Sequence, residues 1–191
     1  MAWKVCLNIL EYCCGIATNA KKLVDKVNNK DSGISVVATR KYFPGTKELI
    51  IKAALAGGVF PHRLGLSETI LIFKQHLCFL GGVDSLVNMI PNIKTKCCEK
   101  KVIVEVETIE KAIKLAKVGV DGIQFNKIPY KDLANYVKII RNINSNITII
   151  AAGGININNI EQYANTGVNE IATSSIFHGK PLDIGVKMEI C

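Results

Sequence analysis

Short apolar runs rich in β-branched residues alternate with helical patterns along most of this 191-residue chain. Runs of this kind are typical of strands that are buried on both faces, as in a parallel sheet. Their alternation with amphipathic helices predicts an α/β fold built from βα units. Six strands are expected, at Ile34–Ala38, Ile70–Phe73, Val102–Val106, Gly122–Phe125, Ile147–Ala152 and Glu170–Thr173.

The spacing of apolar residues also indicates where the helices lie. A long leading helix is predicted because apolar residues recur at helical spacing from Ile9 to Val27, and the polar segment Asn28–Gly33 ends it. Shorter helices are predicted around residues 109–116, 133–140 and 160–164. The first of these has Thr108 as a candidate N-cap and Gly119 just beyond its end.

No linker or low-complexity segment divides the chain, so a single domain with a buried core is expected. Its parts are a leading helix at 1–32, a β/α barrel at 33–176 and a C-terminal tail strand at 177–191, where Asp183–Ile190 alternates. The pattern allows an open doubly wound sheet as well as a TIM-like barrel. Six strands are fewer than the usual eight, so this α/β fold would be an incomplete parallel barrel.

Composition bears on the classes of partner. The formal net charge is +8, yet the basic residues are not interleaved with stacking aromatics, so nucleic-acid binding is not expected. The best candidate for a membrane span, Leu49–Phe60, is broken by Lys52. Glu11 interrupts the first apolar stretch, and no signal-peptide cleavage site follows it. We therefore expect a cytoplasmic protein without a membrane partner.

The seven cysteines lack both the C-x-x-C spacing of a zinc site and the even number of a disulfide framework. Most of them are expected to be reduced residues that fill the core. Cys97 and Cys98 lie among lysines, which favours a solvated loop, with reactive thiols as the alternative.

Polar or small residues follow every predicted strand. In parallel βα folds ligands bind at the carboxyl ends of the strands, so these residues are expected at one rim. They are Thr39, Arg40 and Lys41; Lys74, Gln75 and His76; Glu105 and Glu107; Asn126 and Lys127; Gly153 and Gly154; and Ser174 and Ser175.

Two basic pairs and a glycine pair favour an anionic ligand. Arg40 and Lys41 follow the first strand, and His62–Arg63 lies on a predicted loop between a helix and a strand. Arginine offers phosphate or carboxylate a planar fork, and lysine a point charge. Gly153–Gly154 would let the backbone approach a ligand, beside a helix predicted to start near Asn156. A solvated basic loop and an ordinary tight turn are the alternatives.

Glu105 is an acid inside an apolar strand, where burial is costly without a partner. One interpretation is a carboxylate in a basic pocket that orients a ribose hydroxyl or a hydrated divalent ion. The other is a buried ion pair with Lys41 or Arg63. The sequence does not decide between them.

The segment 38–76, ATRKYFPGTKELIIKAALAGGVFPHRLGLSETILIFKQH, resembles the T-R-K-x-x-P-G … G-G … H-R-x-G-L segment of the quinolinate phosphoribosyltransferase family, the nicotinate-nucleotide pyrophosphorylases. LNILEYCCGIAT, VEVET and AAGGININNIEQYANTGVNEIATSS extend the likeness over nearly the whole chain. AAGGIN, HRLGLSETIL and KPLDIGVKM resemble the ModD branch, pyrophosphorylases associated with molybdenum utilisation.

The resemblance implies an open α/β barrel and a magnesium-dependent reaction of 5-phosphoribosyl 1-pyrophosphate. In it a pyridine nitrogen displaces pyrophosphate at the anomeric carbon. It also implies a homodimer, in which an N-terminal sandwich segment covers the partner subunit's active site. Since this chain begins almost at the barrel's leading helix, we expect a fragment, one half of a split gene or an engineered piece, whose tail strand lacks its sheet.

By position, the resemblance implies catalytic roles for Lys41 and Glu105, with Glu105 reaching Mg²⁺ through water. It implies substrate or phosphate binding by Lys4, Arg40, His62, Arg63, Lys74, Asn126, Gly153, Gly154, Ser174 and Ser175.

Five positions depart from the family's pattern. This chain has Lys4 where the family has arginine, Phe73 where it has lysine, Asn126 where it has aspartate, Ala152 where it has serine and Ser174 where it has glycine. The loss of the substrate-facing lysine indicates an acceptor other than quinolinate, and a less acidic one.

Three functions follow from this likeness. The favoured one is a ModD-type transfer of phosphoribosyl to an unknown, pyridine-like acceptor. The second is the nicotinate-nucleotide pyrophosphorylase of NAD biosynthesis. The third is an inactive fragment or accessory protein that keeps an anion pocket.

Overall fold

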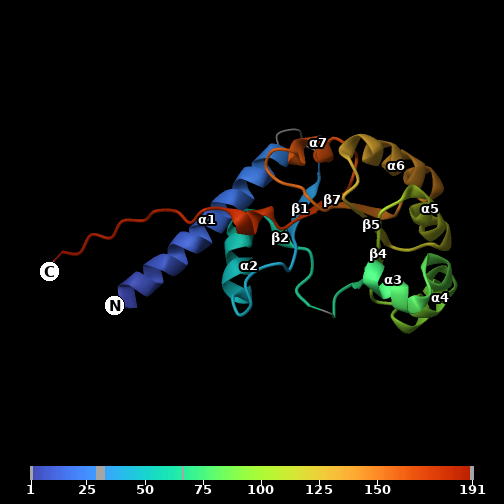
Figure 1. Ribbon diagram of the computed structural model, residues 1–191, viewed down its shortest axis with the longest axis horizontal. Coiled ribbons are helices and arrows are strands. Elements are labelled where there is room, and N and C mark those ends of the chain that lie inside the picture. Colours follow the sequence, from blue (N-terminus) through green and yellow to red (C-terminus); the bar gives the residue numbers. More distant parts are fainter. Residues whose placement is uncertain (1, 29–32, 66, 190–191) are drawn as a thin grey trace.

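The computed structural model describes residues 2–28, 33–65 and 67–189. Seven parallel strands form one curled sheet, in the order β2-β1-β7-β6-β5-β4-β3 (Figure 1). The strands are β1 Ser35–Ala38, β2 Phe60–Pro61, β3 Ile70–Ile72, β4 Val102–Val106, β5 Gly122–Asn126, β6 Thr148–Ala152 and β7 Glu170–Thr173.

The strand order is that of a barrel opened at one seam. From one edge to the other the strands run from β3 to β7 and then continue with β1 and β2. The order is thus the cyclic order of the chain, and the opening lies between β2 and β3. In a doubly wound sheet the order in which successive strands are added would instead reverse at a switch point inside the sheet. The predicted incomplete β/α barrel is therefore confirmed, and the doubly wound alternative is wrong.

All six predicted strands are present, within one residue at each end. The seventh, β2, was missed because it has only two residues, of which one is a proline and the other, Phe60, is exposed. Its pairing with β1 continues past its end, since the backbone N–H of His62 donates to the Ala38 carbonyl at 3.0 Å. His62 and Arg63 therefore follow a strand and do not lie on a remote loop.

Two apolar clusters flank the sheet. The larger fills the space between the strands and the outer helices. The smaller lies inside the curl and is made by Val37, Leu71, Ile103, Ile150, Ala152 and Ala172, with Phe73 packed against it. Inward and outward side chains alternate along each strand, so the inner cluster forms a packed floor beneath the carboxyl ends of the strands.

The outer layer consists of helices that follow the strands. They are α1 Ala2–Asn28, α2 Lys47–Ala56, α3 Lys74–Leu80, α4 Val83–Lys96, α5 Ile109–Val118, α6 Tyr130–Ile143, α7 Ile160–Ala164 and the 3-10 turn η1 Ser175–His178. The sequence patterns gave ranges for α1, α5, α6 and α7. A helix before His62 was expected without bounds, at the place of α2, whereas α3 and α4 were missed. The 27-residue α1 and the other described helices lack the apolar length that crossing a membrane requires.

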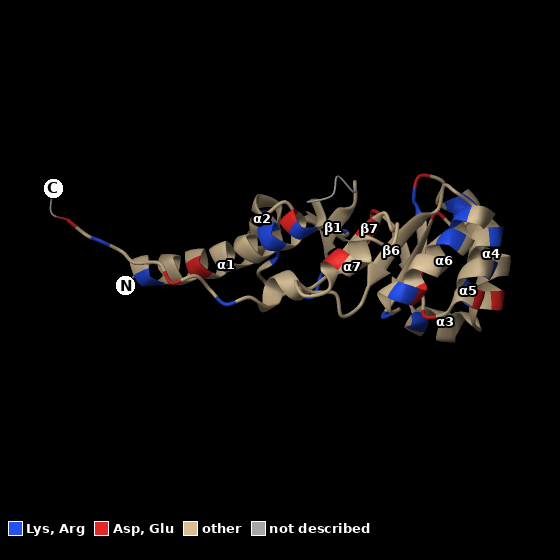
Figure 2. Cartoon of the chain, turned by 90° about the horizontal axis from the view of Figure 1, so that it is seen from above, with Lys and Arg blue, Asp and Glu red and all other residues tan. Residues whose placement is uncertain are grey.

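Helix α1 projects beyond the sheet (Figures 1 and 2). Its C-terminal half packs on the body of the protein through residues such as Ile16, Ala20 and Leu23, which are buried. Its N-terminal half carries exposed apolar side chains, among them Trp3 and Tyr12.

The predicted tail strand is wrong over the described residues, because 180–189 form no strand. This segment runs beside α1, where the backbone N–H of Leu182 donates to the Glu11 carbonyl at 3.1 Å. A helix offers no row of free backbone groups for ladder pairing, so an alternating sequence stays extended but unpaired. Residues 29–32, 190 and 191, which belong to predicted segments, lie outside the described ones.

The predicted core-filling cysteines are also wrong. Of the six described, Cys6, Cys78 and Cys98 are exposed, and Cys13, Cys14 and Cys97 are partly exposed. Cys13 packs against the larger cluster from α1, whereas Cys6 and Cys78 lie on exposed faces of α1 and α3.

Candidate functional site

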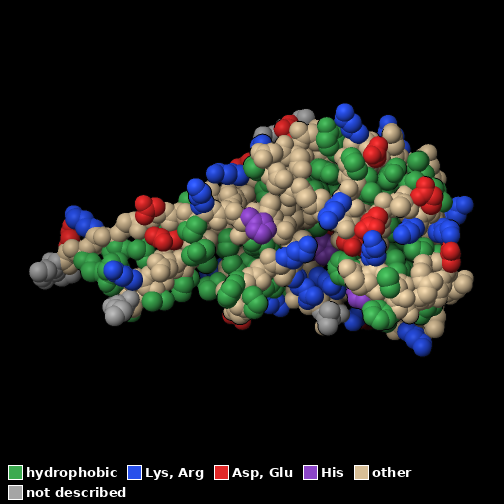
Figure 3. Space-filling view, viewed as in Figure 1, with side chains coloured by type: hydrophobic (Ala, Val, Ile, Leu, Met, Phe, Trp, Pro, Cys, Tyr) green, Lys and Arg blue, Asp and Glu red, His purple; other side chains and the backbone are tan. Residues whose placement is uncertain are grey.

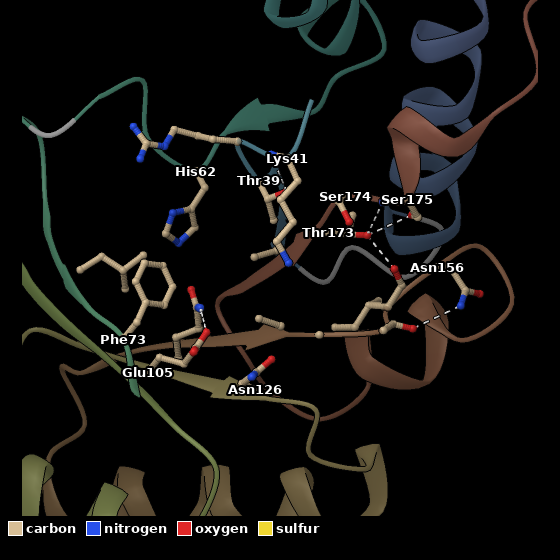
Figure 4. Close-up of a pocket in the computed structure, with 18 of the residues that line it drawn as sticks. Thr39, Lys41, His62, Phe73, Glu105, Asn126, Asn156, Thr173, Ser174 and Ser175 are labelled. Carbon is tan, nitrogen blue, oxygen red and sulfur yellow. Dashed lines mark hydrogen bonds between the residues drawn. The ribbon is translucent and has the colours of Figure 1, made fainter. Parts of the chain in front are cut away.

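The carboxyl ends of all seven strands open into one cavity of about 520 Å³ (Figure 4). Eleven of the residues selected from the sequence line it: Thr39, Arg40, Lys41, His62, Arg63, Glu105, Asn126, Gly153, Gly154, Ser174 and Ser175. Lys, Arg and His side chains gather over the middle of this face of the molecule (Figure 3). Side chains from seven separate segments thus converge as the strand-end argument predicts.

Lys4 and Lys74 do not join them. Lys4 lies on the first turn of α1, 5.5 Å from the centre of the Trp3 ring, where the helix projects away from the strands. Lys74 begins α3, and its Nζ lies 2.9 Å from Glu107 Oε2, outside the cavity. The expected binding roles of both residues therefore have no support within this chain.

Phe73 occupies the cavity side of β3's end. Its backbone N–H donates to His76 Nδ1 at 2.9 Å, and the two rings lie 5.7 Å apart. This contact starts α3 and holds the Phe73 ring at the mouth of the curl. The guanidinium carbon of Arg63 lies 5.9 Å from the centre of that ring, a cation–π contact.

The basic side of the cavity holds positive charges close together. Burial and the neighbouring charge of Arg40 lower the pKa of Arg63, opposed by Glu68. Burial, followed by the charge of Arg63, lowers the pKa of His62, opposed by the Gln124 amide. Its Nε2 is buried and makes no hydrogen bond of normal geometry with the described residues. The lowered pKa favours the neutral form of His62, whereas the arginines carry positive charge.

Glu105 lies opposite, half-buried on β4. Neither of the two predicted partners forms an ion pair with it among the described residues. Its Oε2 accepts a hydrogen bond of 2.7 Å from Gln124 Nε2, directly across on β5. Burial raises the pKa of Glu105, as does Glu107, while the Gln124 hydrogen bond and the charge of Lys41 lower it. The Gln124 amide therefore holds the Glu105 carboxylate at the cavity wall by a hydrogen bond and not by an ion pair.

The predicted helix near Asn156 starts later, since α7 begins at Ile160 and has only 5 residues. A turn precedes it, in which the Asn156 N–H donates to Asn159 Oδ1 at 2.8 Å. The concave surface is instead made by the glycine pair itself, with φ of 88° at Gly153 and 74° at Gly154.

Thr173 joins this loop to the end of β7. Its hydroxyl donates to the Ile155 carbonyl at 2.6 Å and accepts from the Ser175 N–H at 3.0 Å. The two small-residue loops thereby form one surface, which faces Lys41 and Thr39 (Figure 4).

Sequence reasoning missed several lining residues. Gln124, Asn156, Thr173 and His178 were not selected. The signal for Gln124 was present, because it alternates with Asn126 along β5 and is the direct neighbour of Glu105 across the sheet. His178 lies on η1, which no pattern in the sequence indicated.

Residues 16–187 match the sequence profile of a known family, described as "Quinolinate phosphoribosyl transferase, C-terminal domain". The match includes every residue that lines the cavity. The chain belongs to this family.

Individual quinolinate phosphoribosyltransferase relatives agree with this. A protein of Pasteurella multocida with the provisional name pyrophosphorylase ModD is 31% identical over 98% of this chain and 67% of its own length. A provisionally named carboxylating nicotinate-nucleotide pyrophosphorylase of Methanothermobacter thermautotrophicus is 29% identical over 98% of this chain and 68% of its own. The nicotinate-nucleotide pyrophosphorylase structure from Francisella tularensis superposes with a TM-score of 0.78 at 28% identity, covering 90% of this chain and 59% of the other.

The chain spans about two thirds of the length of these relatives. It corresponds to the C-terminal domain of the quinolinate phosphoribosyltransferases, the domain that here contributes the whole rim of strand ends.

The glycine pair gives a matched stability test. A Cβ on Gly153 would lie 2.4 Å from Asn126 Oδ1 and 2.8 Å from the Lys127 backbone nitrogen, whereas one on Gly154 meets nothing within 4 Å. Both have positive φ, so Gly154→Ala should cost about 1–2 kcal/mol of unfolding free energy. Gly153→Ala should cost about 1–3 kcal/mol more through overpacking. Urea unfolding measures both, and equal losses would contradict this packing.

Gln124→Leu tests the amide that holds Glu105. The variant removes a hydrogen bond to the ionised carboxylate, so the pKa of Glu105 should rise further above its ordinary value of 4.5. A raised folded-state pKa stabilises the fold below the unfolded pKa, and this contribution is lost as pH rises through the folded pKa. The variant's stability should therefore fall over a wider, higher pH window. A ¹³C NMR titration of the carboxyl carbon checks the shift, and an unchanged or lowered pKa would contradict the assignment.

Proposed function

We propose that the cavity binds 5-phosphoribosyl 1-pyrophosphate and transfers its phosphoribosyl group to a ring nitrogen of a small acceptor, as a ModD-type pyrophosphorylase. The observation that carries the proposal is the convergence of Arg40, Lys41 and Arg63 with the Gly153–Gly154 loop in one cavity. Membership of a phosphoribosyltransferase family supports the reaction class.

The surface formed by the glycine and serine loops suits the phosphates. Gly153 and Gly154 expose backbone there without side chains, and Ser174 and Ser175 add hydroxyl groups. Lys41 points toward this surface (Figure 4). N–H, O–H and ammonium groups of this kind donate hydrogen bonds to phosphate oxygens, and the ammonium group also neutralises their negative charge.

The chemistry then depends on position and charge. The lone pair of the acceptor's ring nitrogen forms a bond to the anomeric carbon. The bond from that carbon to pyrophosphate breaks, and its electron pair leaves with the pyrophosphate. Arg40 and Lys41 stabilise the charge that builds on the leaving group, and Glu105 orients the ribose hydroxyls.

Mg²⁺ is part of this proposal. Among the described residues, no cluster of three or more His, Cys, Asp or Glu side chains could hold a metal ion alone. Mg²⁺ does not need one, because it is bound through one or two carboxylates together with substrate phosphates and water. Glu105 is the acid that lines the cavity, and Asn126 lies beside it on β5. These two residues would hold the ion, which neutralises pyrophosphate charge when bound.

Two specific observations favour other readings. Asn126, an amide at the rim, supplies no charge for a metal, as expected of an accessory anion-binding protein. The second is that the chain covers about two thirds of the relatives' length, so the proposal is set beside the expected homodimer with a separate N-terminal piece. Release of pyrophosphate by this chain, alone or with such a piece, separates an enzyme from a binding protein.

Arg40→Ala tests the cavity directly. Loss of a charged hydrogen-bonding group should weaken binding of magnesium phosphoribosyl pyrophosphate on the order of 10- to 100-fold. Lys74→Ala, which removes an equal charge outside the cavity, should leave the affinity unchanged. Isothermal titration calorimetry measures both. The proposal fails if folded wild-type protein shows no binding, or if the two variants lose affinity equally.

A further inference from the structure

Asparagine side chains hold the backbone of the glycine pair from the side of α7. Three asparagines, Asn156, Asn158 and Asn159, lie in the turn between β6 and α7. The Gly154 carbonyl accepts a hydrogen bond from Asn156 Nδ2 at 3.2 Å and another from Asn159 Nδ2 at 3.1 Å. A carbonyl oxygen has two lone pairs, so these two amides together fix the direction of the Gly154 carbonyl.

The side chain of Asn159 serves this loop and not its own helix. Asn159 occupies the N-cap of α7, where asparagine is a favoured residue, yet it makes no side-chain capping bond. Its Oδ1 accepts from the Asn156 N–H at 2.8 Å, which leaves its Nδ2 to face the Gly154 carbonyl. The Asn156 amide is oriented in the same way, because its Oδ1 accepts from the Asn158 N–H at 2.9 Å. Each amide is therefore held by its oxygen and donates through its nitrogen.

The direction of the Gly154 carbonyl determines that of the next N–H group. In a planar trans peptide the two groups point in opposite directions, so the Ile155 N–H points away from the asparagine amides. Ile155 lines the cavity although its side chain is buried in the larger apolar cluster, so its backbone provides the lining. Figure 4 shows the Asn156 bond on the side of the loop away from Lys41. Among the described residues, the Ile155 N–H has no acceptor of normal geometry.

Ile155 is also held from its other side, since its carbonyl accepts from the Thr173 hydroxyl at 2.6 Å. Gly153 and Gly154 have no side chains and positive φ, so the loop without these bonds could adopt many conformations. The peptide groups on both sides of Ile155 are instead fixed before a ligand arrives. Donors that are oriented in advance bind an anion without a further cost of ordering.

We infer that Asn156 and Asn159 are positioning residues of the phosphate-binding surface. By holding the Gly154 carbonyl they direct the Ile155 N–H into the cavity, where it donates to a phosphate oxygen of the substrate. This inference rests on the proposed function, because it takes the ligand of the glycine loop to be a phosphate.

Amide NMR of the intact wild-type chain tests the donor. Saturation with magnesium phosphoribosyl pyrophosphate should move the Ile155 amide proton downfield, because the N–H gains a charged acceptor. Inorganic phosphate, as the minimal probe, should move the same proton in the same direction. An Ile155 signal that stays in place while the ligand binds overturns the inference.

Asn159→Asp tests the hold on the loop. The variant keeps the shape and the oxygen that accepts from the Asn156 N–H, but it places a carboxylate oxygen against the Gly154 carbonyl. Asn158→Asp is the matched control, because it adds the same charge at an exposed neighbour whose side chain makes no hydrogen bond to the described residues. Affinity for magnesium phosphoribosyl pyrophosphate, measured by calorimetry, should be about 10-fold or more weaker in Asn159→Asp than in Asn158→Asp.

The Ile155 signal separates positioning from a structural role. At saturating ligand its downfield shift should be lost in Asn159→Asp and kept in Asn158→Asp. A role in stabilising the turn alone would lower the urea unfolding free energy and leave this shift unchanged, which would contradict the inference. Equal losses of affinity in the two folded variants would also contradict it. If Asn159→Asp does not fold, Asn156→Asp takes its place, since it removes the other donor and keeps the oxygen that accepts from the Asn158 N–H.

The two proposals fail separately. If phosphoribosyl pyrophosphate does not bind, the proposed reaction fails, while the titration with inorganic phosphate still decides what the Ile155 N–H does. If phosphoribosyl pyrophosphate binds without a shift of the Ile155 signal, only the positioning role fails.

Discussion

Parallel strand pairing in cyclic order is the constraint on which the rest of this structure depends. Each strand pairs in the same direction as its neighbours, so seven segments spread from Thr39 to Ser175 all end at one rim. The inner apolar cluster closes the curl beneath that rim. The polar residues that follow the strands therefore lie together at this rim, and they line a cavity above the inner apolar layer.

This arrangement carries an electrostatic cost. Arg40 and Arg63 approach each other, and burial disfavours the charged form of His62. The acid across the cavity, Glu105, accepts a hydrogen bond from the Gln124 amide, and the acid whose charge acts on Arg63 is Glu68. Positive charge held close together in a partly buried site is relieved by a bound anion, which is the physical basis of the proposed phosphate binding.

Strands that are buried on both faces could be predicted from the sequence, because a short, continuous run of β-branched apolar residues is typical of such strands. β2 could not, since two residues that include Pro61 carry no pattern, and their strand geometry comes from pairing with β1. The consequence was favourable for the site: His62 and Arg63, expected on a loop, reach the rim through that pairing. The tail failed for the opposite reason, because an alternating pattern needs a neighbouring strand and this one lies beside a helix.

At the site, residue type and strand position together found most of the lining. Lys4 and Lys74 show the limit, because their side chains are basic but the helices that carry them direct them elsewhere. Gln124 shows the converse, since its role comes from a neighbour on another strand, which one strand's sequence does not display.

The most direct test of this account is backbone-amide NMR during titration with magnesium phosphoribosyl pyrophosphate. The account predicts that the largest shift changes fall at the strand ends, on Lys41, Arg63, Gly153, Gly154 and Ser175. Changes confined to the opposite end of the sheet, around the hollow lined by Lys117, Arg141 and Ser145, would contradict it.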